Sequence, residues 1–367
     1  MSTENIRLLK LMVKGSYDLQ ALRIQAGLRL CANFRAKLKE EILQSDSLSE
    51  ENESVAEQEL SAEALDVIKH LKDSYRRLTD GIAKNRTNPT EKGFKGDWLL
   101  SEYTELVLVD QYIRLEQQET AQFRQLIYTL EKIPVYTEYL ANIRGVGPAL
   151  AAVLITYLDP AKARHASSFW RYCGLDVGPD GAGRSRRVEH LIEREYIDKN
   201  GKQATRLSTT YNPWLKMKLL GALGPSFLRS HSPWRDQFDN YKHRIISDPN
   251  KEKVTLIEWK KNFNQMKKQV TDKELSEEDM GVAMRQLWSP GRVKNAAIRY
   301  MVKQFLADFW IKWRTMEGLH VSEPYAVAKL GMLPHGGGGP TTQAAEISQE
   351  IPQYGKNPTR DNIPNWY

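Results

Sequence analysis

Two groups of residues in the middle of the chain have types and spacing that suit phosphate chemistry. The first is the Gly145-Val146-Gly147 corner, where one apolar stretch ends and an alanine-rich apolar stretch begins. Glycine allows a close backbone approach, and Pro148 suits the first turn of a helix, where its missing N–H costs nothing. This pattern predicts a helix-hairpin-helix, which presents backbone amides at a helix N-terminus to a phosphate. The alternative is an ordinary helical corner in a core, because G-x-G alone is a weak signal.

The second group is the Gly- and Arg-rich loop GLDVGPDGAGRSRR, which follows Cys173. Ser185 lies in it among the basic residues Arg184, Arg186 and Arg187. A serine flanked by arginines suits attack on a phosphodiester, because nearby positive charge lowers the pKa of the hydroxyl and holds the scissile phosphate. The alternative is an ordinary loop serine, since a nucleophile also needs a positioned base.

The positive charge of the chain is concentrated around these residues. The 367 residues include 53 Lys+Arg and 46 Asp+Glu, a formal net charge of +7. Residues 1–100 hold 16 of each sign, whereas residues 141–230 hold 14 basic and 7 acidic residues. A localised basic excess is typical of a nucleic-acid site. The residues expected to contact DNA are Arg144, Gly145, Gly147, Arg184, Arg186, Arg187, Lys216, Lys218, Arg292 and Lys294.

Signatures of other chemistry are not evident in the sequence. His165, Cys173 and His190 lie in one region, but their spacing matches no zinc pattern and a fourth ligand is missing. No P-loop, dinucleotide fingerprint or Ser-His-Asp signature occurs. Two cysteines in a chain of this length suit a reducing cytosol, and no apolar stretch is long enough to span a membrane. We therefore expect a cytoplasmic protein with no bound metal, no other cofactor and no membrane partner.

Helical periodicity dominates the segments that must position these residues. Apolar residues recur at three- and four-residue steps from Asn5 to Leu43 and from Ala62 to Leu78. A long helix is predicted from Asp97 to Tyr136, with Pro134 ending or kinking its last turn. Its apolar stripe and its Gln- and Glu-rich back suit a helical hairpin or coiled coil, which makes self-association into a homo-oligomer plausible.

After the corner, the sequence predicts one β-hairpin and one further long helix. The hairpin pairs Arg194–Asp198 with Gln203–Leu207 through a two-residue Asn200-Gly201 turn. The stretch Gly291–Trp313 is a basic amphipathic helix.

The predicted fold is therefore mainly α, with a long helical hairpin or coiled coil leading into a helix-hairpin-helix domain with one small β-hairpin. Asp46–Glu63 holds seven acidic residues and no basic one, which indicates an exposed linker. The predicted parts are N-terminal helices at 1–45, the acidic linker with a helix and a loop at 46–96, the coiled-coil-like helix at 97–139, the helix-hairpin-helix domain at 140–230, a helical insertion at 231–288, the basic helix that completes the domain at 289–325, and a Gly- and Pro-rich flexible tail at 326–367.

This order of parts resembles the C-terminal half of the Piv-type transposases and invertases, the insertion-sequence 110/116/902 family. The resemblance runs from about Leu106 to Leu223 and resumes at Ser289–Arg314. It rests on I-x-G-x-G-x-x-x-A, then D-P, then F-W-x-Y-C-G-L, then the Gly- and Arg-rich loop. The matching positions are Ile143, Gly145, Gly147, Ala151, Asp159-Pro160, Tyr172, Gly174-Leu175 and Arg186-Arg187.

The resemblance implies a coiled-coil helix, then a helix-hairpin-helix domain, and a role in DNA transposition or recombination. Members of the family begin with a RuvC-like domain that carries four acidic metal ligands, the first on an early apolar strand. The helical N-terminus of this chain has no such strand, so Mg²⁺ is implied only if a RuvC-like partner acts in trans. The nucleophilic serine of the family stands in a Ser-Gly step before the Arg-Arg pair. This sequence has Asp180 at that place, and Ser185 lies close by.

Three functions are compatible with these residues. The first is a DNA-binding transposase-like protein that acts in transposition or recombination, or a relative that has lost catalysis. The second is an active serine recombinase that uses Ser185. The third is a non-catalytic helical scaffold for protein interactions, whose basic face is incidental. The expected partner is DNA, with structured RNA as the alternative, and the salt dependence of binding separates the first function from the third.

Overall fold

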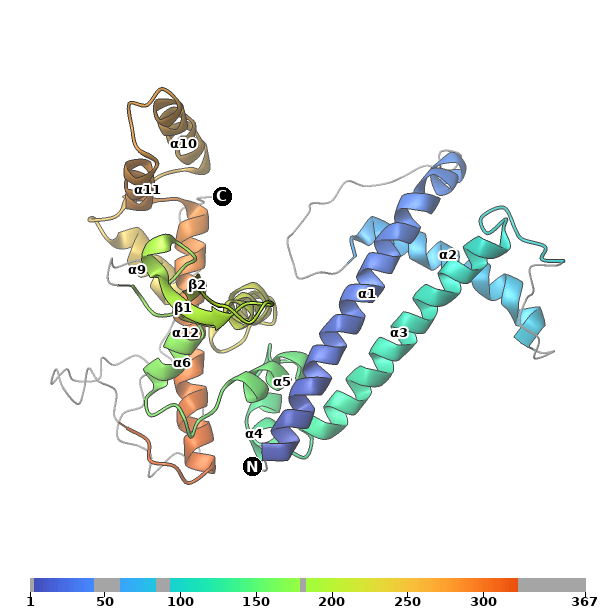
Figure 1. Ribbon diagram of the computed structural model, residues 1–367, viewed down its shortest axis with the longest axis horizontal. Helices are drawn as coiled ribbons and strands as arrows, with labels where there is room; N and C mark the ends of the chain where they lie inside the picture. The colour runs from blue at the N-terminus through green and yellow to red at the C-terminus, as the bar shows by residue number, and fades with distance from the viewer. Residues whose placement is uncertain (1–2, 43–59, 84–92, 179–182, 323–367) are drawn as a thin grey trace. The chain divides into compact units, whose positions relative to one another are not determined.

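Helices account for most of the chain, as the sequence predicts, and the fold is mainly α (Figure 1). The computed structural model describes residues 3–42, 60–83, 93–178 and 183–322. The chain forms two units. Unit 1 contains residues 1–142 and 147–157, and unit 2 contains residues 143–146 and 158–367.

Unit 1 is built on two long antiparallel helices, α1 (Thr3–Ile42) and α3 (Tyr103–Leu130), which lie side by side in Figure 1. Arg23 of α1 pairs with Glu119 of α3, and Lys37 further along α1 pairs with the earlier Glu105. The pairing positions therefore run in opposite directions along the two helices.

A third helix, α2 (Ala62–Ala83), completes the core of unit 1. Phe34, Leu71 and Tyr112 are among the buried residues that the three helices contribute. The apolar stripe of α3 is thus covered by helices of the same chain. Self-association through that stripe stays a prediction. Less of its apolar surface is free for a second copy than the sequence suggests, because α1 and α2 cover part of it.

The long helix is shorter at both ends than predicted. It begins at Tyr103, because the Asp97 carboxylate accepts hydrogen bonds from the backbone N–H groups of Leu99 and Leu100, at 3.0 and 2.8 Å, and holds the preceding segment in a turn. It ends at Leu130. The predicted break at Pro134 is confirmed, because the helix stops before this proline, which begins a separate turn, α4 (Pro134–Thr137), where no N–H is needed.

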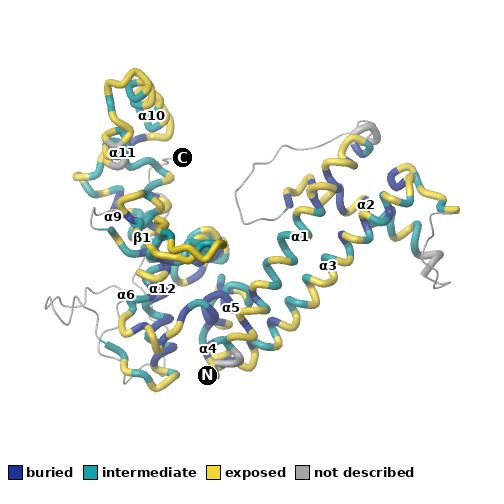
Figure 2. The backbone as a smooth tube through the Cα atoms, viewed as in Figure 1, coloured by how far each residue is buried: buried dark blue, intermediate teal, exposed yellow. Residues whose placement is uncertain are grey.

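The helix that leaves the glycine corner is α5 (Pro148–Tyr157), and Pro148 is its first residue, as predicted. A short 3₁₀ turn, η1 (Leu140–Asn142), precedes the corner. Residues 151–156 of α5 are all buried, which Figure 2 shows as a continuous dark segment. A helix that is apolar on every side is expected in a core. It packs against α1, where the Lys10 ammonium lies 5.1 Å from the centroid of the Tyr157 ring.

Unit 2 is organised around α12 (Pro290–Met316), the basic amphipathic helix of the sequence analysis. Phe305, Phe309 and Trp313 of this helix are at most 1% exposed and stack along it at four-residue steps. Helices α6 (Ala166–Tyr172) and α9 (Arg235–Ser247) pack against it. The other elements of unit 2 are η2 (Val188–His190), β1 (Leu191–Ile197), β2 (Gln203–Thr209), α7 (Pro213–Met217), the π-helical η3 (Lys218–Leu223), α8 (Gly224–Arg229), β3 (Glu252–Lys253), α10 (Leu256–Thr271), α11 (Glu277–Gln286) and β4 (Leu287–Trp288).

Strands β1 and β2 form the predicted antiparallel hairpin, in a register that places Arg194 opposite Arg206. The prediction of a two-residue turn was wrong. The Asp198 N–H donates to the Lys202 carbonyl at 2.9 Å, and the Gly201 N–H donates to the Asp198 carbonyl at 3.1 Å, so three residues form the loop. The Asp198 carboxylate favours this longer loop, because it also accepts the N–H groups of Asn200 and Lys202.

Most of the predicted acidic linker, most of the loop before residue 93 and the predicted tail lie outside the described residues. Within the part of the chain that is described, no helix combines the length and the apolar character needed to cross a bilayer.

Candidate functional site

The two glycines of the corner have different surroundings. Gly145 has a φ of +95°, and its carbonyl accepts a hydrogen bond from the Ser226 hydroxyl at 2.8 Å. A Cβ on Gly145 would lie 2.6 Å from the Ser230 hydroxyl oxygen and 2.9 Å from the Phe227 ring. Gly147 is exposed, and a Cβ there would meet nothing within 4 Å. Gly145 is therefore needed for packing, whereas the Gly147 side of the corner is open to a ligand.

The backbone amides of the corner fit a phosphate contact on this open side. The Val146 N–H donates to the Ile143 carbonyl at 3.0 Å, which closes the turn. The first backbone bond of α5 runs from the Ala151 N–H to the Gly147 carbonyl, at 2.9 Å. Helix geometry leaves the amides before that bond without intrahelical acceptors. The Arg144 side chain is exposed next to the turn.

Ser185 lies beside a histidine that the sequence analysis did not assign to it. The Ser185 hydroxyl oxygen is 3.1 Å from His190 Nδ1, and the Ser185 backbone N–H donates to the same nitrogen at 3.0 Å. His190 is only 2% exposed. The η2 turn carries His190 back toward Ser185, a separation of five residues that no pattern in the sequence singles out.

Arg187 completes the surroundings of the Ser185 hydroxyl. Its Nε donates to the hydroxyl oxygen at 3.0 Å and its backbone N–H does so at 3.3 Å. In the tautomer whose Nδ1 accepts the Ser185 backbone N–H, the same nitrogen can accept the hydroxyl proton, and Arg187 Nη2 lies 3.4 Å from the other ring nitrogen, Nε2. Two donors on the oxygen and one acceptor for its proton form the arrangement that activates a serine hydroxyl. Asp180, which replaces the serine of the family motif, lies outside the described residues.

Arg184 and Lys216 lie under this loop and are not on the outer surface. Arg184 Nε pairs with the Asp176 carboxylate at 3.0 Å, and Lys216 Nζ donates to the Arg184 carbonyl. The Lys216 ammonium also lies 4.8 Å from the centroid of the Tyr211 ring. Burial, and then repulsion by Arg299, lowers the pKa of Lys216 to about 8.

Three other predicted contact residues lie further along the chain. Lys218 is 4% exposed and lies over the Trp214 ring. Arg292 is half-buried, stacks on Trp288 at 4.2 Å and donates to the Leu287 carbonyl at 2.9 Å. Lys294 is exposed on α12. We leave Lys218 and Arg292 out of the interface proposed below, because their cationic groups are engaged inside the unit.

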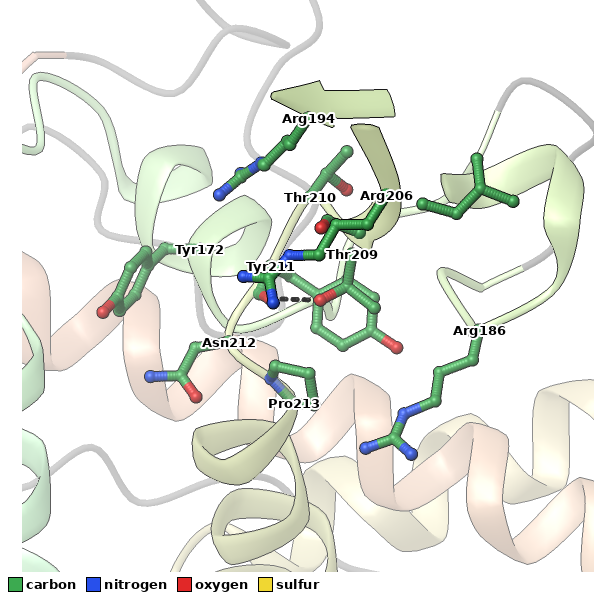
Figure 3. A pocket seen from close by; sticks show the side chains of 11 residues that line it. Tyr172, Arg186, Arg194, Arg206, Thr209, Thr210, Tyr211, Asn212 and Pro213 are labelled. Atoms are coloured by element: carbon green, nitrogen blue, oxygen red, sulfur yellow. Dashed lines mark hydrogen bonds between the residues drawn. The ribbon is translucent and has the colours of Figure 1, made fainter. Parts of the chain in front are cut away.

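A pocket of about 620 Å³ opens between the hairpin and α7 (Figure 3). Arg186, Arg194 and Arg206 line it together with Tyr172 and Tyr211. In Figure 3 these side chains come from α6, the loop before η2, both strands and the segment before α7. Arg186 is one of the residues predicted to contact DNA, whereas Arg194 and Arg206 were not predicted, because a hairpin pattern alone gives no reason to place them at a pocket.

The arginine pair of the hairpin is unfavourable in the absence of a ligand. Arg194 and Arg206 are directly opposite in the register, and like charges at such positions destabilise a strand pair. Both side chains are exposed, and the Arg206 guanidinium stacks 5.1 Å from the centroid of the Tyr196 ring. An anion in the pocket would turn this repulsion into a favourable contact, because arginine binds phosphate oxygens with two parallel donors.

Among the described residues, no three His, Cys, Asp or Glu side chains are grouped to hold a metal ion. His165 bonds the Ser322 hydroxyl at 2.9 Å, and His190 bonds Ser185. Cys173 is fully buried, and burial raises the pKa of its thiol. This shift makes the thiol unreactive.

Part of this chain is similar to a known protein family. Residues 137–198 match the Transposase IS116/IS110/IS902 family, so this segment is transposase-like. The match begins in α4, contains the corner, α5, α6 and the loop with Ser185, and ends just after β1. It confirms the family resemblance for this part of the chain, which is well under half of the 367 residues. No curated protein and no solved structure matches the chain.

A first prediction separates the two glycines of the corner. Gly145→Ala should lower the free energy of unfolding by about 1 to 3 kcal/mol, because the new methyl group meets α8 and the positive φ is strained. Gly147→Ala should change it by less than about 0.5 kcal/mol. Urea unfolding of the full chain measures both. Equal losses at the two positions would contradict the difference in packing.

A second prediction concerns the stability of the chain as a function of pH. The folded state holds the Lys216 pKa at about 8, below the 10.5 of an unperturbed lysine, so its charge destabilises the folded state at neutral pH. Lys216→Met should therefore raise the free energy of unfolding at pH 7, by about 1 to 2 kcal/mol after solvent screening is allowed for. The gain should shrink between about pH 8 and pH 10.5, as the wild-type lysine loses its proton. Exposed Lys294→Met is the control and should show no gain of this kind.

Proposed function

We propose that this chain binds the phosphate backbone of DNA through unit 2 and acts in transposition or recombination. The contact surface consists of the loop around Ser185 and the arginine pocket at the base of the β1–β2 hairpin. This proposal follows from the transposase-like segment, which contains the loop and strand β1. A relative that binds DNA without cutting it fits the same surface.

The observation that carries the proposal is the convergence of Arg186, Arg194 and Arg206 on one open pocket. Their guanidinium groups come from three separate segments, and two of them face each other at a cost to the hairpin. Two arginines at directly opposite positions do not stabilise the hairpin, so its stability alone does not explain this arrangement. Binding of phosphate oxygens explains it, because such contacts position a protein on DNA regardless of sequence.

The glycine corner offers a second contact of the same chemical kind. Arg144 is exposed beside it, and the first amides of α5 lie next to the open Gly147. On α12, the exposed Lys294 extends the basic character of unit 2. The affinity from such contacts falls as the salt concentration rises, because the release of counterions from the DNA is then less favourable.

A third prediction tests the arginine pocket. The double variant Arg194→Gln, Arg206→Gln should weaken DNA binding about equally for unrelated sequences and lower the slope of log K against log[salt] by about one for each arginine. The free energy of unfolding should stay equal or rise by a few tenths of a kcal/mol, since the repulsion is removed. Fluorescence anisotropy with a labelled duplex over a salt series measures the affinity.

The matched control is Lys202→Gln, which removes an exposed charge near the tip of the same hairpin, away from the pocket lining. It should change affinity much less than the double variant. A wild-type affinity that does not depend on salt, or no binding at low salt, would favour the helical scaffold. Tighter binding of a structured RNA than of DNA would make RNA the partner.

A second candidate function is a serine recombinase, and the contact between Ser185 and His190 favours it. In this reaction the Ser185 oxygen would attack phosphorus while its proton passes to His190 Nδ1. An Oγ–P bond forms as one P–O bond of the DNA strand breaks, and the departing oxygen takes a proton from water. Arg187 would stabilise the charge that develops on the serine oxygen before attack.

A fourth prediction tests this candidate. Ser185→Ala should abolish both strand exchange and the covalent protein–DNA adduct, and leave DNA affinity within about twofold of wild type. His190→Gln should reduce the rate by about 10²-fold or more, because general-base catalysis is typically worth that much. Ser167→Ala on α6 is the control, since that serine is exposed outside the loop. Undiminished exchange by Ser185→Ala would remove Ser185 from catalysis and leave DNA binding as the proposed function.

A further inference from the structure

A cluster of positively charged side chains lies half-buried beneath the loop that carries Ser185. Its four members are Arg184, Lys216, Arg299 and Lys303, and we call it the cationic cluster. Arg184 comes from the loop, Lys216 from α7, and the other two from neighbouring turns of α12. Burial lowers the pKa of Lys303 and of Arg299, as it does for Lys216.

The cluster has far less negative charge than positive charge. Asp176 is the carboxylate that faces it from the described residues, and Arg184 already pairs with one of its oxygens at 3.0 Å. Lys216, Arg299 and Lys303 form no ion pair with any residue that the structure describes. The phenol groups of Tyr211 and Tyr241 also face Arg299. Half-buried charges that have no ion-pair partner among the described residues destabilise the folded state, and a bound anion would offset this cost.

Individual atoms of the cluster also lack hydrogen-bond partners. Within the described part of the chain, Arg299 Nε and Asp176 Oδ1 are buried and make no hydrogen bond. Arg299 Nε and Asp176 Oδ1 do not form a hydrogen bond with each other, although the two side chains interact electrostatically. The two lysines of the cluster contact neutral groups. Lys303 lies 4.4 Å from the centroid of the Trp170 ring, and Lys216 donates to the Arg184 carbonyl.

The backbone of the loop is shaped around the Arg299 guanidinium. A Cβ on Gly183 would lie only 1.6 Å from Arg299 Nη1 and 2.4 Å from its Cζ. The guanidinium therefore occupies the space that any other residue at position 183 would need. This close approach holds the charge directly under Arg184 and Ser185, the next residues of the loop.

We propose that the cationic cluster is a binding site for a phosphate group, held by Lys216, Arg299 and Lys303 beneath the loop. A tetrahedral oxyanion accepts several charge-assisted hydrogen bonds at once, and its negative charge offsets most of the unpaired positive charge. Two sources share this chemistry, a phosphodiester of nucleic acid and free phosphate. Only the phosphodiester rests on the proposed function, in which it would lie next to Ser185.

The first test compares the thermal unfolding of the full chain in sodium phosphate and in sodium chloride at equal ionic strength and pH 7. Phosphate should raise the Tm of the wild type in a saturable manner, because it binds the folded state alone. Arg299→Met should have an equal or higher Tm in chloride, since a buried charge is removed, and it should lose the phosphate increment. Lys303→Met should weaken phosphate binding at least tenfold.

Two further variants make this test specific. Gly183→Ala keeps every charge but forces the guanidinium out of its place, so it should also lose the phosphate increment. Lys294→Met removes an exposed charge from the same helix and should keep it. The absence of an increment in the wild type, or the same increment in Arg299→Met, would overturn the proposal.

A second arm identifies the source of the phosphate group. If it belongs to DNA, Arg299→Met should weaken duplex binding and inorganic phosphate should compete with the duplex for the wild type. If it is free phosphate, Arg299→Met should bind DNA as the wild type does while the Tm increment is lost. The variant Arg194→Gln, Arg206→Gln should keep the phosphate increment in both cases. DNA binding and the phosphate site can therefore fail separately.

Discussion

The packing of α12 fixes both the core of unit 2 and the position of its buried charge. Phe305, Phe309 and Trp313 anchor one side of this helix in the core. Arg299 and Lys303 are four residues apart and so lie on one side of the same helix, one turn above the other. The packed side of the helix fixes where the backbone of both residues lies, so both side chains start from the same side of α12. Close packing therefore maintains an electrostatic arrangement that would not persist on a mobile element.

The helices and the hairpin could be predicted because their patterns are local. Apolar residues at helical spacing identified α1 and α12, the glycine corner with Pro148 and the apolar run after it identified α5, and Asn200-Gly201 between alternating residues identified the hairpin. The predictions that failed were those decided by single hydrogen bonds from a carboxylate to backbone N–H groups two to four residues away. The Asp97 carboxylate moves the start of α3, and the Asp198 carboxylate lengthens the hairpin loop. Periodicity carries no information about such bonds.

The candidate site was predicted in part, for a related reason. Arg186 and Gly147 were recognised because glycine and arginine in a short loop indicate phosphate contact without any tertiary information. His190, Arg206 and Arg299 were missed. Each gains its role only when a turn, a strand register or a distant helix brings it to the loop. A basic segment in the sequence also does not distinguish exposed Arg186 from buried Lys218, although the two differ completely in their access to DNA.

Unit 2 places like charges together twice, in the hairpin pair Arg194–Arg206 and in the cationic cluster. The two cases differ in how water acts on them. Exposed arginines interact through a high dielectric, so salt screens them and each contributes modestly to binding. Half-buried cations are screened far less, so each repels its neighbours more strongly and attracts an anion more strongly. The exposed arginines would attract an oxyanion from solution, and the half-buried cations of the cluster would bind it more strongly. Residue arrangements that lower stability are expected where function requires them. The Arg194–Arg206 pair and the cationic cluster are two such arrangements, and each includes a residue of the transposase-like segment.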